Sequence, residues 1–305
     1  MPHRRAAHPA RHGRRGEGGR KGASAFPFAK SVRHLKKNRG LSLILVFLAG
    51  CAALEPAPPG AIVFALTGDA PYSEAEVLRF DALIDDLNAR DLAFVAHVGD
   101  ITSGRGPCTD EWFEARKRQF ARLEHPFILL PGDNDWTDCH RTGFDPMERL
   151  RKWRELFCDQ RLIHQSGEYC EHVRWQLGGL VFVAVNVPGS HNNYGRPEYA
   201  PRMQAVFSWL DEAEALSRGR TLVILMQANP FVAGRGYETL LERLRKLGAE
   251  RPGKVILVNG DTHTYRNDEP LPGLRRVEVW GSPFVGWLRG SITADGVAVE
   301  QGGMR

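Results

Sequence analysis

Four Gly-Asp dipeptides, each placed directly after an apolar, strand-like run, are the residues of this sequence best suited to chemistry. They are Gly68-Asp69, Gly99-Asp100, Gly132-Asp133 and Gly260-Asp261. Glycine lets the backbone turn sharply after a strand, and functional groups of an open α/β sheet gather at the carboxyl ends of its strands. Four carboxylates at one edge would repel one another unless a cation neutralised them. The pattern therefore indicates a metal site, although Gly-Asp pairs also occur in ordinary turns.

The elements that must position these acids are apolar, β-branched runs alternating with amphipathic stretches. We expect strands over 61–67, 92–98, 126–130, 173–177, 180–185, 221–226, 254–258, 275–280 and 285–292, and helices over 74–89, 110–123, 146–157, 201–217 and 236–247. Ser73 with Glu76 forms a capping box, and Asp145 precedes a first-turn proline, so both helix starts are well marked. Without repeats or an internal linker, residues 61–305 are predicted to form one domain.

The order of these residues resembles that of the calcineurin-like metallophosphoesterases, and within them a purple-acid-phosphatase-like bacterial branch. The pattern of that family is D-x-H, G-D, G-N-H-[DE], a lone His and G-H-x-H. The corresponding segments here are Asp69-Ala70-Pro71, Gly99-Asp100, Gly132-Asp133-Asn134-Asp135, Gln227 and Gly260-Asp261-Thr262-His263. The resemblance covers nearly all of residues 61–290. It implies a four-layer α/β/β/α sandwich of two mixed sheets flanked by helices.

Carried over by position, the resemblance implies two divalent metal ions and six ligands. The ligands would be Asp69, Asp100, Asp133, Gln227, Asp261 and His263. Asp100 would bridge both ions, so catalysis would depend on it most. Two cations roughly 3.5–4 Å apart can activate a water and clamp phosphoryl oxygens. The resemblance thus implies hydrolysis of a small-molecule phosphoester.

Several positions depart from the family pattern. At three positions where the family has ligand histidines, this sequence has Pro71, Gln227 and Asp261. Asp133 replaces the ligand Asn, and Asn134 stands at the catalytic position of the histidine that protonates the leaving group. The remaining oxygen-rich set suits Mg²⁺, Mn²⁺ or Ca²⁺, with iron a further candidate, better than Zn²⁺. An altered site and a decayed one both explain these changes. The alternative is therefore a non-catalytic metal- or ligand-binding lipoprotein on the same scaffold.

Other polar residues on the expected loops are candidates for contact with substrate. His140 and His191 could replace the missing general acid, and Arg141 and Arg196 could bind phosphate, although a plain surface role stays open for each. His97 lies inside an expected strand and is interpreted as a core histidine.

Four cysteines after position 51 suggest two disulfides in an exported protein. Cys108 and Cys139 each follow an Asp-bearing loop tip by a few residues, so we expect them to pair. Cys158 and Cys170 then pair by elimination. A structural zinc site is the alternative, but the sequence has no C-x-x-C motif.

Residues 1–50 are interpreted as a basic leader with a lipoprotein signal peptide. The basic residues before position 40 precede the short apolar run 41–48, which is too short to span a membrane. The run ends in Leu48-Ala49-Gly50-Cys51, which resembles a lipobox and implies lipid on Cys51. Ala52 after the cysteine resembles lipoproteins of the outer membrane, here facing the periplasm. Translation from Val32 or Leu35 would give a leader of ordinary length, and 51–60 reads as a Pro-rich tether.

The charge balance separates the leader from the body. The first 50 residues hold 12 Lys or Arg and one acid, which leaves 29 basic residues of 41 and 35 acidic residues of 36 for the rest. An acidic body is a poor binder of nucleic acid, because phosphate contacts need clustered Lys and Arg. We therefore expect no nucleic-acid partner, and a nuclease is disfavoured.

Overall fold

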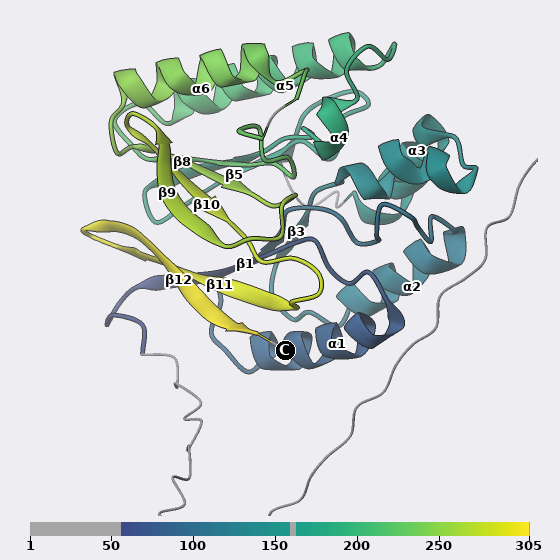
Figure 1. Cartoon of the computed structure of the whole chain (residues 1–305). Helices are drawn as coiled ribbons and strands as arrows, with labels where there is room; N and C mark the ends of the chain where they lie inside the picture. The colour runs from purple at the N-terminus through teal and green to yellow at the C-terminus, as the bar shows by residue number, and fades with distance from the viewer. Residues whose placement is uncertain (1–55, 159–162, 233, 305) are drawn as a thin grey trace, which may run out of the picture. The chain divides into compact units, whose positions relative to one another are not determined.

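The computed structural model describes residues 56–158, 163–232 and 234–304. In this part of the chain two β-sheets pack face to face, and helices cover the outer face of each sheet (Figure 1). The predicted α/β/β/α sandwich is confirmed.

The smaller sheet has five strands in the order β12-β11-β1-β2-β3. Their bounds are β1 Ile62–Thr67, β2 Val95–His97, β3 Phe127–Leu129, β11 Gly286–Thr293 and β12 Gly296–Met304. Strands β1, β2 and β3 run parallel, whereas β11 and β12 are antiparallel to their neighbours. The helices on this side are α1 Glu74–Asn88, α2 Asp110–Phe120 and α3 Pro146–Phe157.

The larger sheet has seven strands in the order β4-β5-β6-β7-β8-β10-β9. Their bounds are β4 Ile163–His164, β5 Val173–Leu177, β6 Leu180–Ala184, β7 Leu222–Leu225, β8 Val255–Asn259, β9 Arg266–Leu271 and β10 Leu274–Glu278. The longer helices α5 Tyr199–Leu216 and α6 Glu238–Glu250 cover it, and α4 Gly189–Asn192 is a single turn near the sheet edge (Figure 1).

Strand residues alternate between two buried faces, which explains why the strands read as continuous apolar runs. In β6, Phe182 packs between the two sheets, whereas Val181 and Val183 pack against α5 and α6. In β1, Phe64 faces the other sheet and Ala65 faces α1. The two faces together bury most of the apolar side chains of the domain.

The nine expected strands and five expected helices are all present, with ends shifted by a few residues. Three strands were missed. β9 is a polar edge strand of sequence RNDEPL, and β4 has two residues, so neither carries an apolar pattern. β12 contains Gly302, where a Cβ atom would come within 2.4 Å of the Trp287 ring. Val297 and Val299 of this strand alternate onto the core between the sheets, and the glycine pair that packs on the indole ends this apolar pattern.

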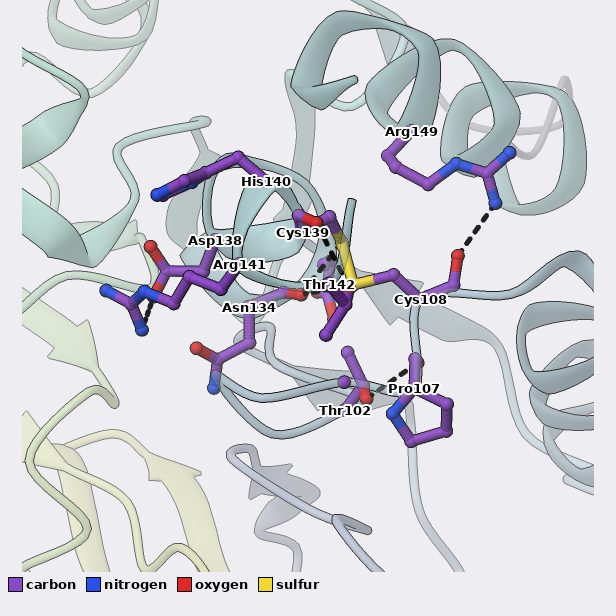
Figure 2. Close-up of a disulfide and its surroundings, with 12 residues drawn as sticks. Thr102, Pro107, Cys108, Asn134, Asp138, Cys139, His140, Arg141, Thr142 and Arg149 are labelled. Carbon is purple, nitrogen blue, oxygen red and sulfur yellow. Dashed lines mark hydrogen bonds and ion pairs between the residues drawn. A yellow bond between two sulfur atoms is a disulfide. The ribbon is translucent and has the colours of Figure 1, made fainter. Parts of the chain in front are cut away.

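Both predicted disulfides are confirmed. Cys108 and Cys139 are joined across 31 residues, and Cys158 and Cys170 across 12. The first disulfide connects the segment after β2 to η2, the 3₁₀ turns at Thr137–Thr142 that follow β3 (Figure 2). Its two sulfur atoms lie 3.6 and 3.4 Å from the carbonyl oxygen of Asn134. The bridge therefore packs directly beneath a loop-tip residue.

The leader, the predicted lipobox with Cys51 and the first half of the tether fall outside the described residues, and the predicted domain bounds stay predictions. Within the described ranges, no helix is both long and apolar enough to cross a membrane.

Removal of the first disulfide by Cys108→Ala with Cys139→Ala should lower the free energy of unfolding by about 2–4 kcal/mol, because the unfolded chain regains the freedom of a long loop. Urea denaturation measures the change. The control is Cys158→Ala with Cys170→Ala, whose shorter loop predicts a smaller loss. A larger loss in the control would contradict this account.

Candidate metal and phosphoester site

The loop tips after β1, β2, β3 and β8 bring the four predicted aspartates together. Glycine is required where one tip packs on the next. A Cβ atom at Gly132 would lie 2.0 Å from Asp100 Oδ1, and one at Gly260 would lie 2.1 Å from Asp69 Oδ2. The absence of a side chain at these two glycines therefore leaves room for the carboxylates of Asp100 and Asp69 against the neighbouring backbone.

The backbone at these tips adopts an uncommon conformation. Asp69, Asp100, Asp261 and His263 have φ of 50°, 60°, 80° and 56°. Left-handed backbone outside glycine is uncommon and costs of order 1–3 kcal/mol where it is strained. Its repetition at four predicted ligands indicates that side-chain placement, rather than local stability, determines these turns.

Asp100 is the most heavily bonded of the four acids. Its Oδ1 accepts the backbone N–H of Asn134 at 2.9 Å, and its Oδ2 accepts Gln227 Nε2 at 3.0 Å and the Tyr72 hydroxyl at 3.2 Å. The side chain is 2% exposed. Asp100 therefore contacts residues from three other loop tips.

Asp69 is fully buried and accepts the backbone N–H of Asp261 on both oxygens, at 3.0 and 3.1 Å. Asp261 in turn accepts the backbone N–H of Asn229 on Oδ2 at 3.0 Å. The tips after β1, β7 and β8 are thus connected through two carboxylates.

Asp133 and Asp261 face the same small space beside Gly189. A Cβ atom at Gly189 would come 2.5 Å from Asp261 Oδ1 and 2.8 Å from Asp133 Oδ1. The other oxygen of Asp133 accepts the Ser190 hydroxyl at 2.7 Å. These two Oδ1 atoms are the carboxylate oxygens best placed to share a cation.

Gln227 and His263 lie at the site, as expected. Gln227 Oε1 accepts the backbone N–H of Gly189 at 2.5 Å, so its amide oxygen is already engaged. His263 Nδ1 donates to the Ser282 carbonyl at 2.7 Å, which fixes the tautomer and leaves Nε2 as the ligand atom. That Nε2 lies 3.9 Å from Asp69 Oδ1.

The sequence analysis missed Tyr72, whose hydroxyl lies between three predicted site residues. The oxygen is 3.2 Å from Asp100 Oδ2, from His263 Nε2 and from Asn134 Nδ2. Burial raises its pKa well above the ordinary value, so it is a phenol here. The available signal was its position directly after Pro71. The phenol oxygen is a further possible ligand where the family histidine is absent.

Asp135 has a structural role that the sequence analysis also missed. It is fully buried and accepts the backbone N–H groups of Asp100 at 3.0 Å, Ile101 at 2.8 Å and Gly132 at 2.8 Å. One carboxylate thereby holds the tips after β2 and β3 together. The available signal was the acidic position that ends the G-N-H-[DE] pattern.

The predicted general-acid candidates lie beside the acid cluster and not within it. Asn134 is in the cluster, but an amide does not supply a proton. His140 and His191 line an adjoining cavity of about 710 Å³, together with Asp138 and Arg141. Figure 2 shows Asn134, Asp138, His140 and Arg141 around the Cys108–Cys139 bridge. The ion pair between Asp138 and Arg141 spans 2.6 Å.

His97 is confirmed as a core histidine. It is fully buried, its Nε2 contacts the Ala70 carbonyl at 2.8 Å, and its Nδ1 accepts the Gly99 N–H at 3.2 Å. Burial lowers its pKa to about 4, so it stays neutral. It supports the tips after β1 and β2 from below.

The electrostatics of the cluster are dominated by burial of like charges. Burial, reinforced by the neighbouring carboxylates, raises the pKa of Asp69 and of Asp100 well above the ordinary value. Burial also raises the pKa of Asp135 and of Asp261 to about 7. Partial burial raises the pKa of Asp138, which lies at the side of the cluster, to about 6. A cation among these groups would favour their ionised forms.

The donor set fits a divalent cation with a preference for oxygen. Aspartate oxygens are ligands typical of Mg²⁺, Mn²⁺ and Ca²⁺ sites, whereas the single imidazole is a ligand more typical of iron. The cluster is an open row rather than one tight shell. Within the described ranges, three His, Cys, Asp or Glu ligand atoms lie within 4.8 Å of one another only at Cys158, Cys170 and Glu171. There the cysteines are disulfide-bonded and Glu171 pairs with Arg154, so that group is no metal site.

Comparisons with known proteins agree with this fold. A family model described as calcineurin-like phosphoesterase matches residues 63–265. A dimetal phosphatase from Danio rerio is similar in structure, with a TM-score of 0.54 and 12% identity over 79% of this chain and 95% of that chain. GAP50, the anchor in the inner membrane complex of Plasmodium, has a TM-score of 0.54 and 12% identity over 79% and 84% of the two chains. No curated protein sequence matches significantly.

The raised pKa values predict that metal-free protein loses stability as the pH rises from about 4 to just above 7, and above pH 6.5 no buried histidine opposes the last part of this loss. Asp135 and Asp261 titrate near pH 7 when folded and near 3.9 when unfolded, so their stabilisation is complete below pH 4 and is lost as the pH rises through 7. Buried His97 and His172, with pKa lowered to about 4, act in the opposite direction, but only below about 6.5.

Thermal denaturation in EDTA measures this effect. The Tm should fall between pH 6.5 and 8, and added Mn²⁺ should raise the Tm more at pH 8 than at pH 6, because protons and the cation compete for the same oxygens. A Tm increment from Mn²⁺ that is equal at the two pH values would contradict the cluster.

Proposed function

This chain belongs to the calcineurin-like phosphoesterase family, and we propose that it hydrolyses a small-molecule phosphoester with the aid of two divalent cations. We further propose that it is an exported, lipid-anchored enzyme. The single observation that carries the proposal is the row of buried and partly buried carboxylates at the tips after β1, β2, β3 and β8. Burial raises the pKa of Asp69, Asp100 and Asp261. Four acids in such a place are costly to bury without a cation.

In this proposal the position of each side chain determines its role. Asp69 and His263 would hold one cation, Asp133 and Asp261 would hold the second, and Asp100 lies where it could serve both. The cations would supply an activated water and neutralise the phosphoryl oxygens. Asp135 fixes the tip that carries Asp100 by accepting the backbone N–H groups of Asp100 and Ile101, and it connects this tip to the one after β3 by accepting that of Gly132.

The proton for the leaving group has two candidate donors. His140 and His191 line the cavity that adjoins Asp133, whereas Asn134 carries no proton to give. His140 Nδ1 is bonded to the Thr137 carbonyl at 2.7 Å, so its Nε2 is the atom available for proton transfer.

The alternative is a non-catalytic lipoprotein that keeps the scaffold. Gln227 supports it, because its amide nitrogen and oxygen bond to Asp100 and Gly189 and thereby fill a ligand position from within the protein. The fold alone does not discriminate, since one similar structure is a phosphatase and another is an anchor.

Lipid anchoring rests on the lipobox-like sequence that ends at Cys51. In a bacterial host that processes lipoproteins, the full chain should take up labelled palmitate and fractionate with the outer membrane, and Cys51→Ala should remove the label. Unchanged labelling of the variant would rule out this anchor.

Asp100→Asn should lower kcat/KM for phosphoester hydrolysis by roughly a thousandfold or more, because charge stabilisation at the reacting group is removed. Hydrolysis of p-nitrophenyl phosphate and of bis-p-nitrophenyl phosphate is measured with Mg²⁺, Mn²⁺, Ca²⁺ and Fe²⁺. The control is Asp295→Asn, an exposed residue of the β11–β12 turn, which should leave activity unchanged. Wild-type protein inactive with every cation would favour the binding lipoprotein, and retained turnover in Asp100→Asn would exclude the two-cation site.

A further inference from the structure

The cavity of about 710 Å³ beside the acid cluster has the size of a small-molecule site, which is typically about 300–1,000 Å³. Its walls come from η2, the start of α3, and the segment from Ser190 to Glu198. Ser190 forms the boundary, since its Oγ lies 2.7 Å from Asp133 Oδ2 and 3.0 Å from both oxygens of Asp138. One molecule can therefore contact the acid cluster at one end and fill the cavity with the other.

The acidic groups of the cavity wall are already neutralised or engaged. Asp138 pairs with Arg141 at 2.6 Å, and Glu198 pairs with the buried Arg202 at 2.8 Å. Asp145 caps α3 by accepting a backbone N–H of the first turn at 2.7 Å. Two of the three carboxylates are therefore paired with an arginine, and among the residues that the structure describes only Asp145 keeps a charge without an ion pair.

Apart from Arg141, which pairs with Asp138, the basic groups of the same wall are not neutralised. Within the ranges that the structure covers, the Arg196 guanidinium makes no hydrogen bond or ion pair, and neither does the His191 imidazole. His140 uses only Nδ1. The basic groups left to bind a ligand are therefore a permanent cation and two imidazoles, which favour an anionic ligand.

The wall is held in an unusual backbone conformation. Ser190 to Asn193 have φ of 45°, 59°, 54° and 51°, a left-handed turn without glycine that costs roughly 1–2 kcal/mol per residue. Arg202, 1% exposed, donates to the side chain of Asn192 at 2.7 Å and to its backbone carbonyl at 2.8 Å. Asn192 also donates to the Gly236 carbonyl at 2.7 Å. A buried network thus maintains a turn that directs Ser190 to the acids and His191 to the cavity.

We propose that this cavity binds the leaving group of the phosphoester, and that the leaving group carries an anionic group of its own, a carboxylate or a second phosphate, which Arg196 binds. This inference rests on the proposed phosphoester hydrolysis and narrows its substrate class to phosphoesters with an anionic leaving group.

The first test varies the charge of the leaving group. Phosphoethanolamine, glycerol phosphate and 3-phosphoglycerate have cationic, neutral and anionic leaving groups, and propanediol bisphosphate replaces the carboxylate by phosphate. Wild-type kcat/KM should rise along this order, and Arg196→Gln should reduce the preference for anionic over neutral by about tenfold, the value of one charge-assisted contact. The control Arg218→Gln, an exposed arginine beyond the far end of α5, should keep the wild-type order. Equal rates for all substrates, or an unchanged preference in Arg196→Gln, would overturn the proposal.

The second test separates this inference from the proposed reaction. Glycerate and glycerol are titrated into the full protein in EDTA while the imidazole NMR signals of His140 and His191 are followed. Glycerate should shift both signals, glycerol should not, and Arg196→Gln should need roughly tenfold more glycerate. Unmoved signals overturn the anionic pocket whatever the activity. If the protein binds glycerate but hydrolyses no phosphoester, the anionic pocket is supported and the proposed hydrolysis is refuted.

Discussion

Repulsion among buried carboxylates is the interaction on which the rest of this structure depends. Asp69 and Asp100 are held almost without solvent beside Asp133 and Asp261, and their raised pKa values show that the protein alone does not stabilise their charge. Protons relieve this repulsion at low pH and a divalent cation relieves it at neutral pH. The same constraint explains why the neighbouring groups are donors: Gln227 Nε2, Asn134 N and the Tyr72 hydroxyl all point at Asp100.

The scaffold concentrates its strain at this edge. The sandwich supplies rigid strand ends, and the tips beyond them adopt left-handed backbone at residues other than glycine. Networks beneath the tips hold these conformations: Asp135 connects two tips, the Cys108–Cys139 bridge packs under Asn134, and Arg202 anchors the turn after β6. Each of these groups acts on the site through the backbone, so their loss would disturb ligand placement without removing a ligand.

The sequence allowed the fold and most of the site to be predicted, for reasons that differ by residue. Asp69, Asp100, Asp133 and Asp261 were found because each follows an apolar run and a glycine. Tyr72 and Asp135 were missed because their roles depend on how separate tips meet, although the position after Pro71 and the acidic end of the G-N-H-[DE] pattern marked where they lie. Similarly, β9 is a polar strand that pairs at a sheet edge, and the apolar alternation of β12 is short and ends at a glycine that packs on an indole. His140 and His191 were found as polar loop residues, but only the cavity showed that they share a wall.

Anomalous diffraction from crystals soaked in Mn²⁺ at neutral pH tests the central claim most directly, because it locates the cation without reference to activity. This account predicts two peaks among Asp69, Asp100, Asp133, Asp261 and His263, separated by about 3.5–4 Å, with Asp100 between them. A single peak held by Asp133 and Asp261 would leave the cation site but remove the bridging role of Asp100. No peak at the loop tips, with Mn²⁺ bound elsewhere or not at all, would contradict the account.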